Sequence, residues 1–160
     1  TLPERRKHLL RRDVSVVFQD FKILTNQTVF ANVALPLKVR GIPRHIIDKR
    51  VRAVLRSLHL DQKAMSPCEE LSGGEQQRVA VARAVVVKPK LLLADAPTGN
   101  LDYELSMRMM DIFQQFHKFG TSIMIATHNR EIMERMSGAR VVTLHDGVMH
   151  EGCVETGGGL

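Results

Sequence analysis

The chain has 160 residues, of which 44% are hydrophobic and 25% are charged. These values fit one soluble globular domain with its own core and exclude two full domains. No run of about 18 uncharged apolar residues occurs, so no membrane-spanning helix is expected. The net charge of +6 is concentrated early, in ERRKHLLRR and PRHIIDKRVRAVLR. These segments either attract an anionic membrane or nucleic acid, or form solvated helix faces. Aromatic residues make up 4% of the chain, too few for base stacking, so no nucleic-acid partner is expected.

The first half of the chain predicts one strand followed by helices. The β-branched run V-S-V-V-F at 14–18 is typical of a buried strand. Thr28 is a candidate N-cap for a helix, and Pro36 should kink or end that helix. A second helix follows Pro43, because apolar residues repeat there at intervals of three and four: Ile46, Ile47, Val51, Val54, Leu55 and Leu58.

The second half alternates between helices and strands. After S-P-C-E-E-L-S-G-G a helix is expected, and Pro97 and Gly99 should end the strand that comes next. Gly120 should stop an amphipathic helix, and Asp146-Gly147 is a hairpin turn signal. The expected segments, in order, are a strand at 91–95, a helix at 104–119, a strand at 121–127, a short helix at 129–138 and two strands within 139–152.

This alternation predicts an α/β fold with a parallel sheet covered by helices. The purely helical segment at 28–67 interrupts the alternation, so we interpret it as a helical subdomain inserted into the core. The α/β core then comprises residues 14–20 and 88–151, with a C-terminal β-hairpin. The glycine-rich residues 152–160 are expected to form a flexible tail.

The most specific pattern is L-S-G-G-E-Q-Q-R-V-A-V-A-R-A at 71–84. Ser72, Gly73 and Gly74 stand directly before the predicted helix. Glycines let backbone N–H groups approach an anion, and the helix N-terminus adds about half a positive charge. The segment therefore predicts a phosphate-binding edge, although an ordinary N-capped helix would also fit these residues.

This segment resembles the signature motif of ABC-type ATPases, a family with a P-loop NTPase-like core. Three further motifs match in the family's order: V-V-F-Q-D, with Gln19, resembles the Q-loop; L-L-L-A-D-A-P-T-G-N-L-D, with Asp95 and Asp102, resembles Walker B and the D-loop; and I-M-I-A-T-H-N, with His128, resembles the H-loop. The amino-acid sequence in and around these motifs is most similar to that of ABC ATPases of bacterial cell division. Lipoprotein-release and macrolide-export ATPases share nearly the same motifs.

The resemblance implies ATP and Mg²⁺ as cofactors and assigns roles to single residues. Asp95 would hold a Mg²⁺-bound water, and Gln19 would touch both the metal shell and the attacking water. His128 would orient water and stabilise charge near the γ-phosphate. Without the resemblance, Asp95 would cap a turn and His128 would be an ordinary surface or core residue.

The resemblance also implies a head-to-tail homodimer with ATP at the seam. Ser72 to Gly74, with Glu75 and Gln76, would bind the nucleotide held by the other subunit, and Asp102 would lie along the seam. An integral membrane subunit would dock near Gln19 to Phe30. Phe21, Ile23, Leu24 and Phe30 either form that docking patch or pack inside the helical subdomain.

Two departures from the family pattern bear on activity. No G-x-x-x-x-G-K-[ST] motif, which would cradle the β- and γ-phosphates, occurs in the sequence. In the family this motif precedes the Q-loop, so a missing N-terminal segment is the simplest expectation. Ala96 stands where the family has its catalytic glutamate, and a methyl group accepts no proton. A general base contributes about 10²–10⁴-fold, so hydrolysis should be impaired.

Three functions follow as alternatives. The first is an ATP-hydrolysing subunit that couples dimer closure to a membrane partner in cell division. The second is a non-hydrolysing scaffold, which Ala96 and the absent phosphate loop favour. The third is the ATPase of a lipoprotein or drug exporter. In each case the expected location is cytoplasmic, on the inner face of the cell membrane.

Overall fold

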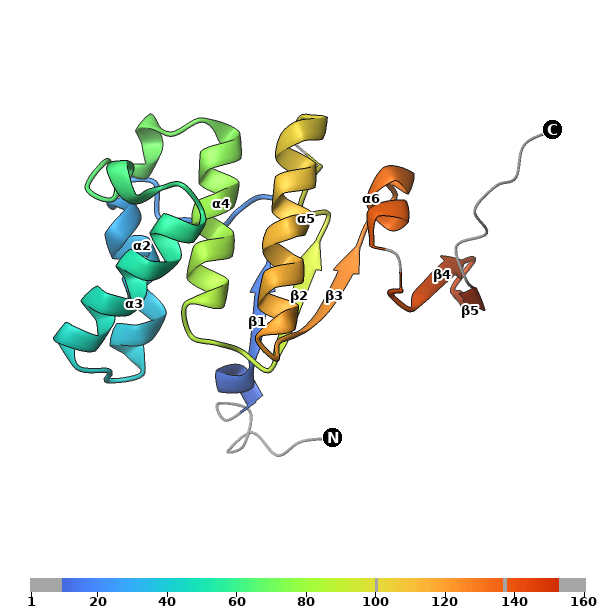
Figure 1. Cartoon of the computed structure of the whole chain (residues 1–160), viewed down its shortest axis with the longest axis horizontal. Helices are drawn as coiled ribbons and strands as arrows, with labels where there is room; N and C mark the ends of the chain where they lie inside the picture. The colour runs from blue at the N-terminus through green and yellow to red at the C-terminus, as the bar shows by residue number, and fades with distance from the viewer. Residues whose placement is uncertain (1–9, 100, 137, 153–160) are drawn as a thin grey trace.

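The computed structural model describes residues 10–99, 101–136 and 138–152. Of the tail expected at 152–160, all but Gly152 lies outside the described residues. Figure 1 shows the elements in chain order: β1 (Val14–Val17), α2 (Val29–Val39), α3 (Arg44–Ser57), α4 (Gly73–Val85), β2 (Leu91–Asp95), α5 (Tyr103–Lys118), β3 (Ser122–Ala126), α6 (Arg130–Arg135), β4 (Val141–His145) and β5 (Val148–Gly152), with short 3-10 turns at Asp61–Lys63 and Cys68–Glu70.

The predicted α/β fold with a parallel sheet is confirmed. Strands β1, β2 and β3 form one parallel sheet in that order, and β4 and β5 form a separate antiparallel hairpin. In the register, Val17 lies beside Ala94 and Asp95 beside Ala126. Because the strands are parallel, the segments that follow them emerge at one edge of the sheet.

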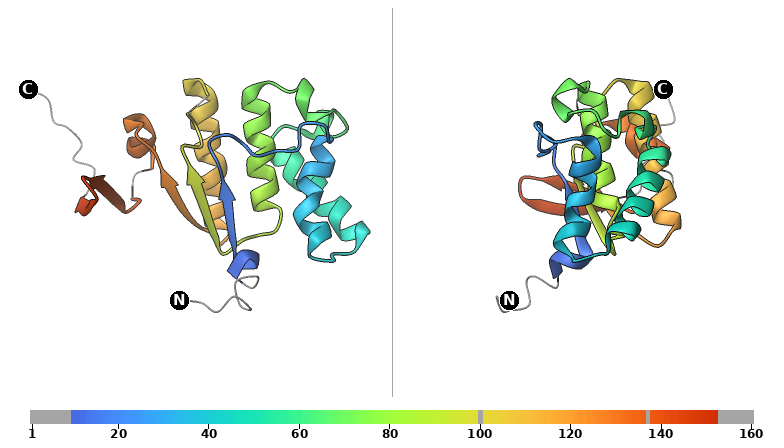
Figure 2. Two further views of the ribbon diagram at one scale, coloured as in Figure 1. Left: turned by 180° about the vertical axis from the view of Figure 1, so that it is seen from behind. Right: turned by 90° about the vertical axis from the view of Figure 1, so that its left-hand side faces the viewer.

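The two faces of the sheet differ in burial. Leu92 and Ala94, alternate residues of β2, are buried. Helices α4 and α5 lie over one face of the sheet (Figure 1). The opposite face carries the laterally aligned residues Val16, Leu93 and Met124, and Met124 is 65% exposed. Figure 2 shows this face from behind, with no described helix across it.

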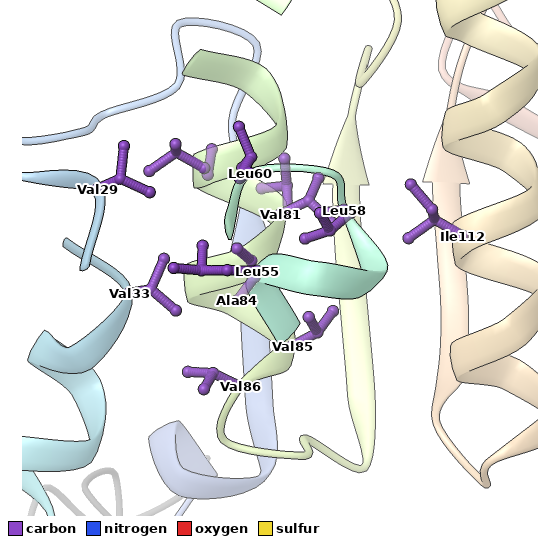
Figure 3. Close-up of a cluster of buried hydrophobic side chains, with 14 of the residues drawn as sticks. Val29, Val33, Leu55, Leu58, Leu60, Val81, Ala84, Val85, Val86 and Ile112 are labelled. Atoms are coloured by element: carbon purple, nitrogen blue, oxygen red, sulfur yellow. The ribbon is translucent and has the colours of Figure 1, made fainter. Parts of the chain in front are cut away.

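The main core lies where α2, α3 and α4 meet (Figure 3). Thr28 caps α2 as predicted, since its Oγ1 accepts a hydrogen bond from the N–H of Ala31 at 3.1 Å. Apolar side chains of all three helices are fully buried there, among them Val33, Leu55 and Val81. This burial supplies most of the helices' stability, because isolated helices of this length are marginal in water.

Of the two outcomes expected at Pro36, a kink or the end of the helix, the end is wrong. Helix α2 continues through Pro36 to Val39. A proline inside a helix costs about 3 kcal/mol, but Leu37, which follows it, is completely buried. Burying a leucine side chain contributes about 1.5–3 kcal/mol, and the N–H of Arg40 still bonds the carbonyl of Pro36 at 3.3 Å.

The remaining predicted elements are confirmed, with ends that differ by up to three residues, the largest difference being at the end of α6 (Arg130–Arg135). Gly120 follows α5 with a φ of 93°, as its role as a stop requires. Asp146 and Gly147 join β4 and β5 with φ values of 49° and 77°, which is the geometry of a tight hairpin turn. Within the part of the chain that is described, no helix combines the length and apolarity needed to cross a bilayer.

Candidate functional site

The segments that follow β1 and β2 together form an open pocket. Its lining residues are Phe18, Gln19, Asp20, Lys22 and Asp95, and its volume is about 420 Å³. Gln19 and Asp95, which sequence analysis singles out, are therefore brought together at the carboxyl edge of the sheet. Both side chains are exposed, so a ligand can reach them.

Position 96 follows Asp95 directly, and Gly99 lies near both Ala96 and Gln19. A Cβ atom placed on Gly99 would lie 3.8 Å from Ala96 Cβ and 3.8 Å from Gln19 Nε2. Ala96 has a φ of 40°, a left-handed conformation that is uncommon for residues other than glycine. Its N–H donates to the carbonyl of Ala126 at 3.0 Å, which helps to fix the turn.

His128 lies two residues beyond β3, at the same edge of the sheet as Asp95. Its side chain is exposed. Among the described residues His128 does not line the pocket that holds Gln19 and Asp95. Its assignment as a water-orienting residue therefore stays a prediction.

The signature segment opens α4 with a complete capping box. The Ser72 hydroxyl accepts from the N–H of Glu75 and donates to Glu75 Oε2 at 3.0 Å, and Glu75 Oε2 also accepts from the N–H of Ser72 at 2.9 Å. The N–H groups of Gly73 and Gly74 have no acceptor among the described residues. These two N–H groups can bind an anion, while the Ser72 hydroxyl would first have to leave Glu75.

The side chains of Glu75 and Gln76 make contacts within the protein. Lys63 Nζ lies 2.6 Å from Glu75 Oε1. This ion pair, followed by the bonds from Ser72, lowers the pKa of Glu75 despite its partial burial. Gln76 Nε2 donates to the carbonyls of Cys68 and Leu71. The predicted contact of Glu75 and Gln76 with nucleotide stays a prediction.

Gly74 and Asp102 are linked through Leu105. A Cβ on Gly74 would lie 3.0 Å from Leu105 Cδ1 and 3.4 Å from Leu101 Cδ2, so a larger residue here would require these leucine side chains to shift. Asp102 caps α5 by accepting from the N–H of Leu105 at 2.8 Å. The signature segment and the D-loop aspartate thus share one surface region.

The apolar residues after Gln19 are divided between core and surface. Phe21, Ile23 and Phe30 are partly buried and pack against the core. Leu24 is 44% exposed. Packing inside the fold therefore accounts for three of the four residues proposed as a docking patch.

The pocket's chemistry fits a magnesium–nucleotide group. Mg²⁺ prefers oxygen ligands and is usually held by one or two carboxylates together with substrate phosphates. Asp95 supplies a carboxylate and Gln19 an amide oxygen within one pocket. Lys22, at the same pocket, carries a positive charge and lies 2.6 Å from Asp20.

Asp20 and Lys22 were not among the predicted site residues. Both lie in the pocket because the chain turns sharply after Gln19, where Phe21 and Lys22 have φ values of 61° and 47°. No glycine marks this turn, so composition gives no signal for it. Their position directly after the Q-loop glutamine was the only available indication.

Comparison with known proteins shows which family the chain belongs to. The family model described as ABC transporter matches residues 1–99, which is more than half of the 160-residue chain. The chain belongs to the ABC transporter family. It is 44% identical over 149 residues to the cell division ATP-binding protein FtsE of Bacillus subtilis, covering 93% of this chain and 65% of that protein. The FtsE of Escherichia coli K12 is 45% identical over 151 residues, covering 94% and 68%.

FtsE of Streptococcus pneumoniae R6 is 47% identical over 139 residues, covering 87% of this chain and 60% of the relative. The chain thus spans about two thirds of the length of these relatives. The resemblance of the chain to an ABC-type ATPase domain is confirmed at the level of the family. The roles of single residues within those motifs remain predictions.

Proposed function

We propose that this chain is the ATP-binding subunit of an FtsE-type ABC complex in bacterial cell division. One observation carries the proposal: Gln19 and Asp95 share a pocket at the carboxyl edge of the sheet, and Ala96 follows Asp95 directly. The similarity to FtsE proteins over most of the chain supports the biological setting.

Asp95 and Gln19 would hold Mg²⁺, which when bound neutralises phosphate charge and positions the terminal phosphate. Asp95 contributes the charge, and Gln19 contributes an amide that can accept from or donate to water. His128 would act from the same edge of the sheet. Gly73 and Gly74, whose N–H groups are free among the described residues, would bind the nucleotide held by a second copy in a head-to-tail dimer.

Because position 96 carries no carboxylate, we expect slow ATP hydrolysis. Ala96 cannot take a proton from water, so turnover should be slow while nucleotide binding is retained. This favours a second candidate function, a non-hydrolysing scaffold that senses ATP. In either case residues 28–67 would act as the helical subdomain. An FtsX-like membrane subunit would dock near Gln19 to Phe30, placing the chain in the cytoplasm at the inner face of the membrane.

The test compares ATP turnover of the complete gene product carrying Ala96 with its Ala96→Glu variant. Turnover should rise by about 10²–10⁴-fold with glutamate, whereas ATP affinity should change little. Asp95→Asn serves as a control, because loss of the carboxylate should weaken Mg²⁺-dependent binding in both backgrounds. Equal turnover of the parent protein and its Ala96→Glu variant would contradict the assignment of position 96.

A further inference from the structure

Helix α4 is attached to both loops of the pocket by two side chains that the motif assignments leave without a role. Gln77 Nε2 donates to the carbonyl of Pro97 at 2.6 Å, in the loop that follows Asp95 and Ala96. Arg83 Nη2 donates to the carbonyl of Phe21 at 3.1 Å, in the loop that follows Gln19. A single helix thus contacts the loop after β1 and the loop after β2.

The Gln77 contact is buried. Gln77 is 1% exposed, and its Oε1 has no partner among the described residues. Pro97 is also buried, so the bond forms where water does not compete with it. In such surroundings a hydrogen bond is stronger and its loss is more costly. Among the described residues, the bond from Nε2 to the Pro97 carbonyl is therefore the one hydrogen bond that offsets the burial of the Gln77 amide.

The Arg83 contact holds a strained turn. Phe21 and Lys22 are successive non-glycine residues in the left-handed region, with φ values of 61° and 47°. Such conformations persist only where surrounding contacts impose them. The half-buried guanidinium of Arg83, whose pKa is lowered by burial, supplies such a contact at the carbonyl of Phe21.

Gln77 and Arg83 lie on the same helix as the signature glycines. The helix begins at Gly73 and ends at Val85, so its N-terminal end carries the signature glycines. Gln77 lies one turn after those glycines, and Arg83 lies near the other end of the helix. The two contacts therefore connect the loops after β1 and β2 with the helix that presents Gly73 and Gly74.

We propose that Gln77 and Arg83 are positioning residues that tie the pocket of Gln19 and Asp95 to the signature end of α4. The inference rests on the proposed function, in which the pocket holds the subunit's own nucleotide and the signature end contacts the nucleotide of a second copy. Nucleotide binding and association of two copies are then coupled through α4.

The first experiment needs no nucleotide. Hydrogen exchange is measured in the complete gene product and in its Gln77→Met and Arg83→Met variants. Gln77→Met should raise exchange about three- to tenfold in the loop around Pro97, and Arg83→Met should do so in the loop around Phe21, as expected for one lost hydrogen bond. Exchange within α4 should stay unchanged. Gln114→Met, the same change at a half-buried position of α5, is the control. Unchanged exchange in both loops would overturn the inference.

The second experiment measures ATP affinity and ATP-driven self-association, the latter by sedimentation. Gln77→Met and Arg83→Met should each weaken association about three- to tenfold with ATP affinity changed less than twofold. Arg83→Lys, which keeps a charged donor, should recover part of the loss. If the parent associates with ATP and both methionine variants associate as Gln114→Met does, the coupling through α4 is refuted. A parent that binds no ATP refutes the proposed function instead, and the exchange experiment still tests the two contacts.

Discussion

Helices α2, α3 and α4 bury most of their apolar side chains, although Leu35 and Val39 of α2 are exposed, whereas strands β3, β4 and β5 expose many of theirs. Leu37, Val51 and Leu55 are completely buried, while Met124 is 65% and Leu144 is 73% exposed. Apolar burial contributes about 25 cal/mol per Å², so the helices gain far more from it than the strands. The described molecule is therefore expected to open first around β3 to β5 and last around α4.

The largest expected effect is the difference in stability loss between an alanine substitution in the helical core and one in the exposed hairpin. Leu55→Ala removes a fully buried side chain and should cost about 2–5 kcal/mol of unfolding free energy, because a cavity remains in a packed core. Leu144→Ala, at an exposed position of β4, should change stability by less than about 0.5 kcal/mol. Urea unfolding of both variants checks the difference. Similar losses would show that the hairpin is packed as tightly as the helices.

The second prediction concerns a buried polar side chain, because the helical region also contains the buried amide of Asn32. The Asn32 side chain accepts from the N–H of Leu24 at 2.8 Å and donates to the carbonyl of Leu24 at 2.9 Å. It also donates to Cys68 Sγ at 3.2 Å. Asn32→Ala leaves the N–H of Leu24 without its acceptor, while the Leu24 carbonyl keeps its bond from the N–H of Gln27. The substitution should cost about 1–3 kcal/mol.

Exposed Asn26 offers a matched control. Asn26→Ala should be close to neutral, since surface substitutions usually stay within about 0.5 kcal/mol. Chemical denaturation gives the stabilities, and proteolysis reports whether the segment before α2 loosens. If the two alanine variants were equally stable, apolar burial alone would explain the difference between the regions.

The same two regions differ in how far the sequence predicts them. In the helical region the periodic apolar residues and the Thr28 cap are confirmed, because side-chain period and capping are local properties. Pro36 is the exception, since burial of Leu37 on a tertiary surface outweighs the local cost of proline. In the strand region the elements are confirmed, but the exposure of Met124 depends on what covers the sheet and has no local signal.

For the candidate site, the motifs indicate Gln19 and Asp95, and the structure brings them into one pocket. The contacts of Gln77 and Arg83 with Pro97 and Phe21 join residues that are 20 and 62 positions apart. Pairing over such separations depends on tertiary packing, so no local pattern reveals it. Likewise, a serine in a signature motif does not reveal that its hydroxyl is bonded to Glu75.

A smaller effect concerns the junction at which α4 begins. Ser72→Ala removes the cap and should cost about 1 kcal/mol, whereas Ser72→Gly should cost only a few tenths. The reason is that Ser72 Oγ accepts from the N–H of Glu75 at 3.3 Å, which alanine cannot replace, while glycine suits the cap backbone. Thermal unfolding measures both losses. Ser57→Ala, near the end of α3, is the control, and a larger loss there would show that the capping box adds little.

The smallest effect concerns the ion pair beside this cap and depends on pH. Lys63 is the main cause of the lowered pKa of Glu75, followed by the bonds from Ser72. A carboxyl whose pKa is lowered by folding stabilises the protein above its unfolded pKa of about 4.3 and loses that contribution as pH falls through its folded value. Lys63→Met should therefore destabilise the protein at neutral pH.

Because the Lys63 side chain is 47% exposed, solvent screens the pair, and the loss should stay below about 1 kcal/mol. The difference between parent and variant should shrink as pH falls below about 4.3, where Glu75 in the unfolded chain is already protonated. Lys49→Met, at an exposed position of α3, should show no such pH dependence. If the stability difference between parent and Lys63→Met stayed constant as the pH fell, Lys63 would act through the packing of its aliphatic stem. The start of α4 would then be stabilised by apolar contact, as the rest of the helical region is.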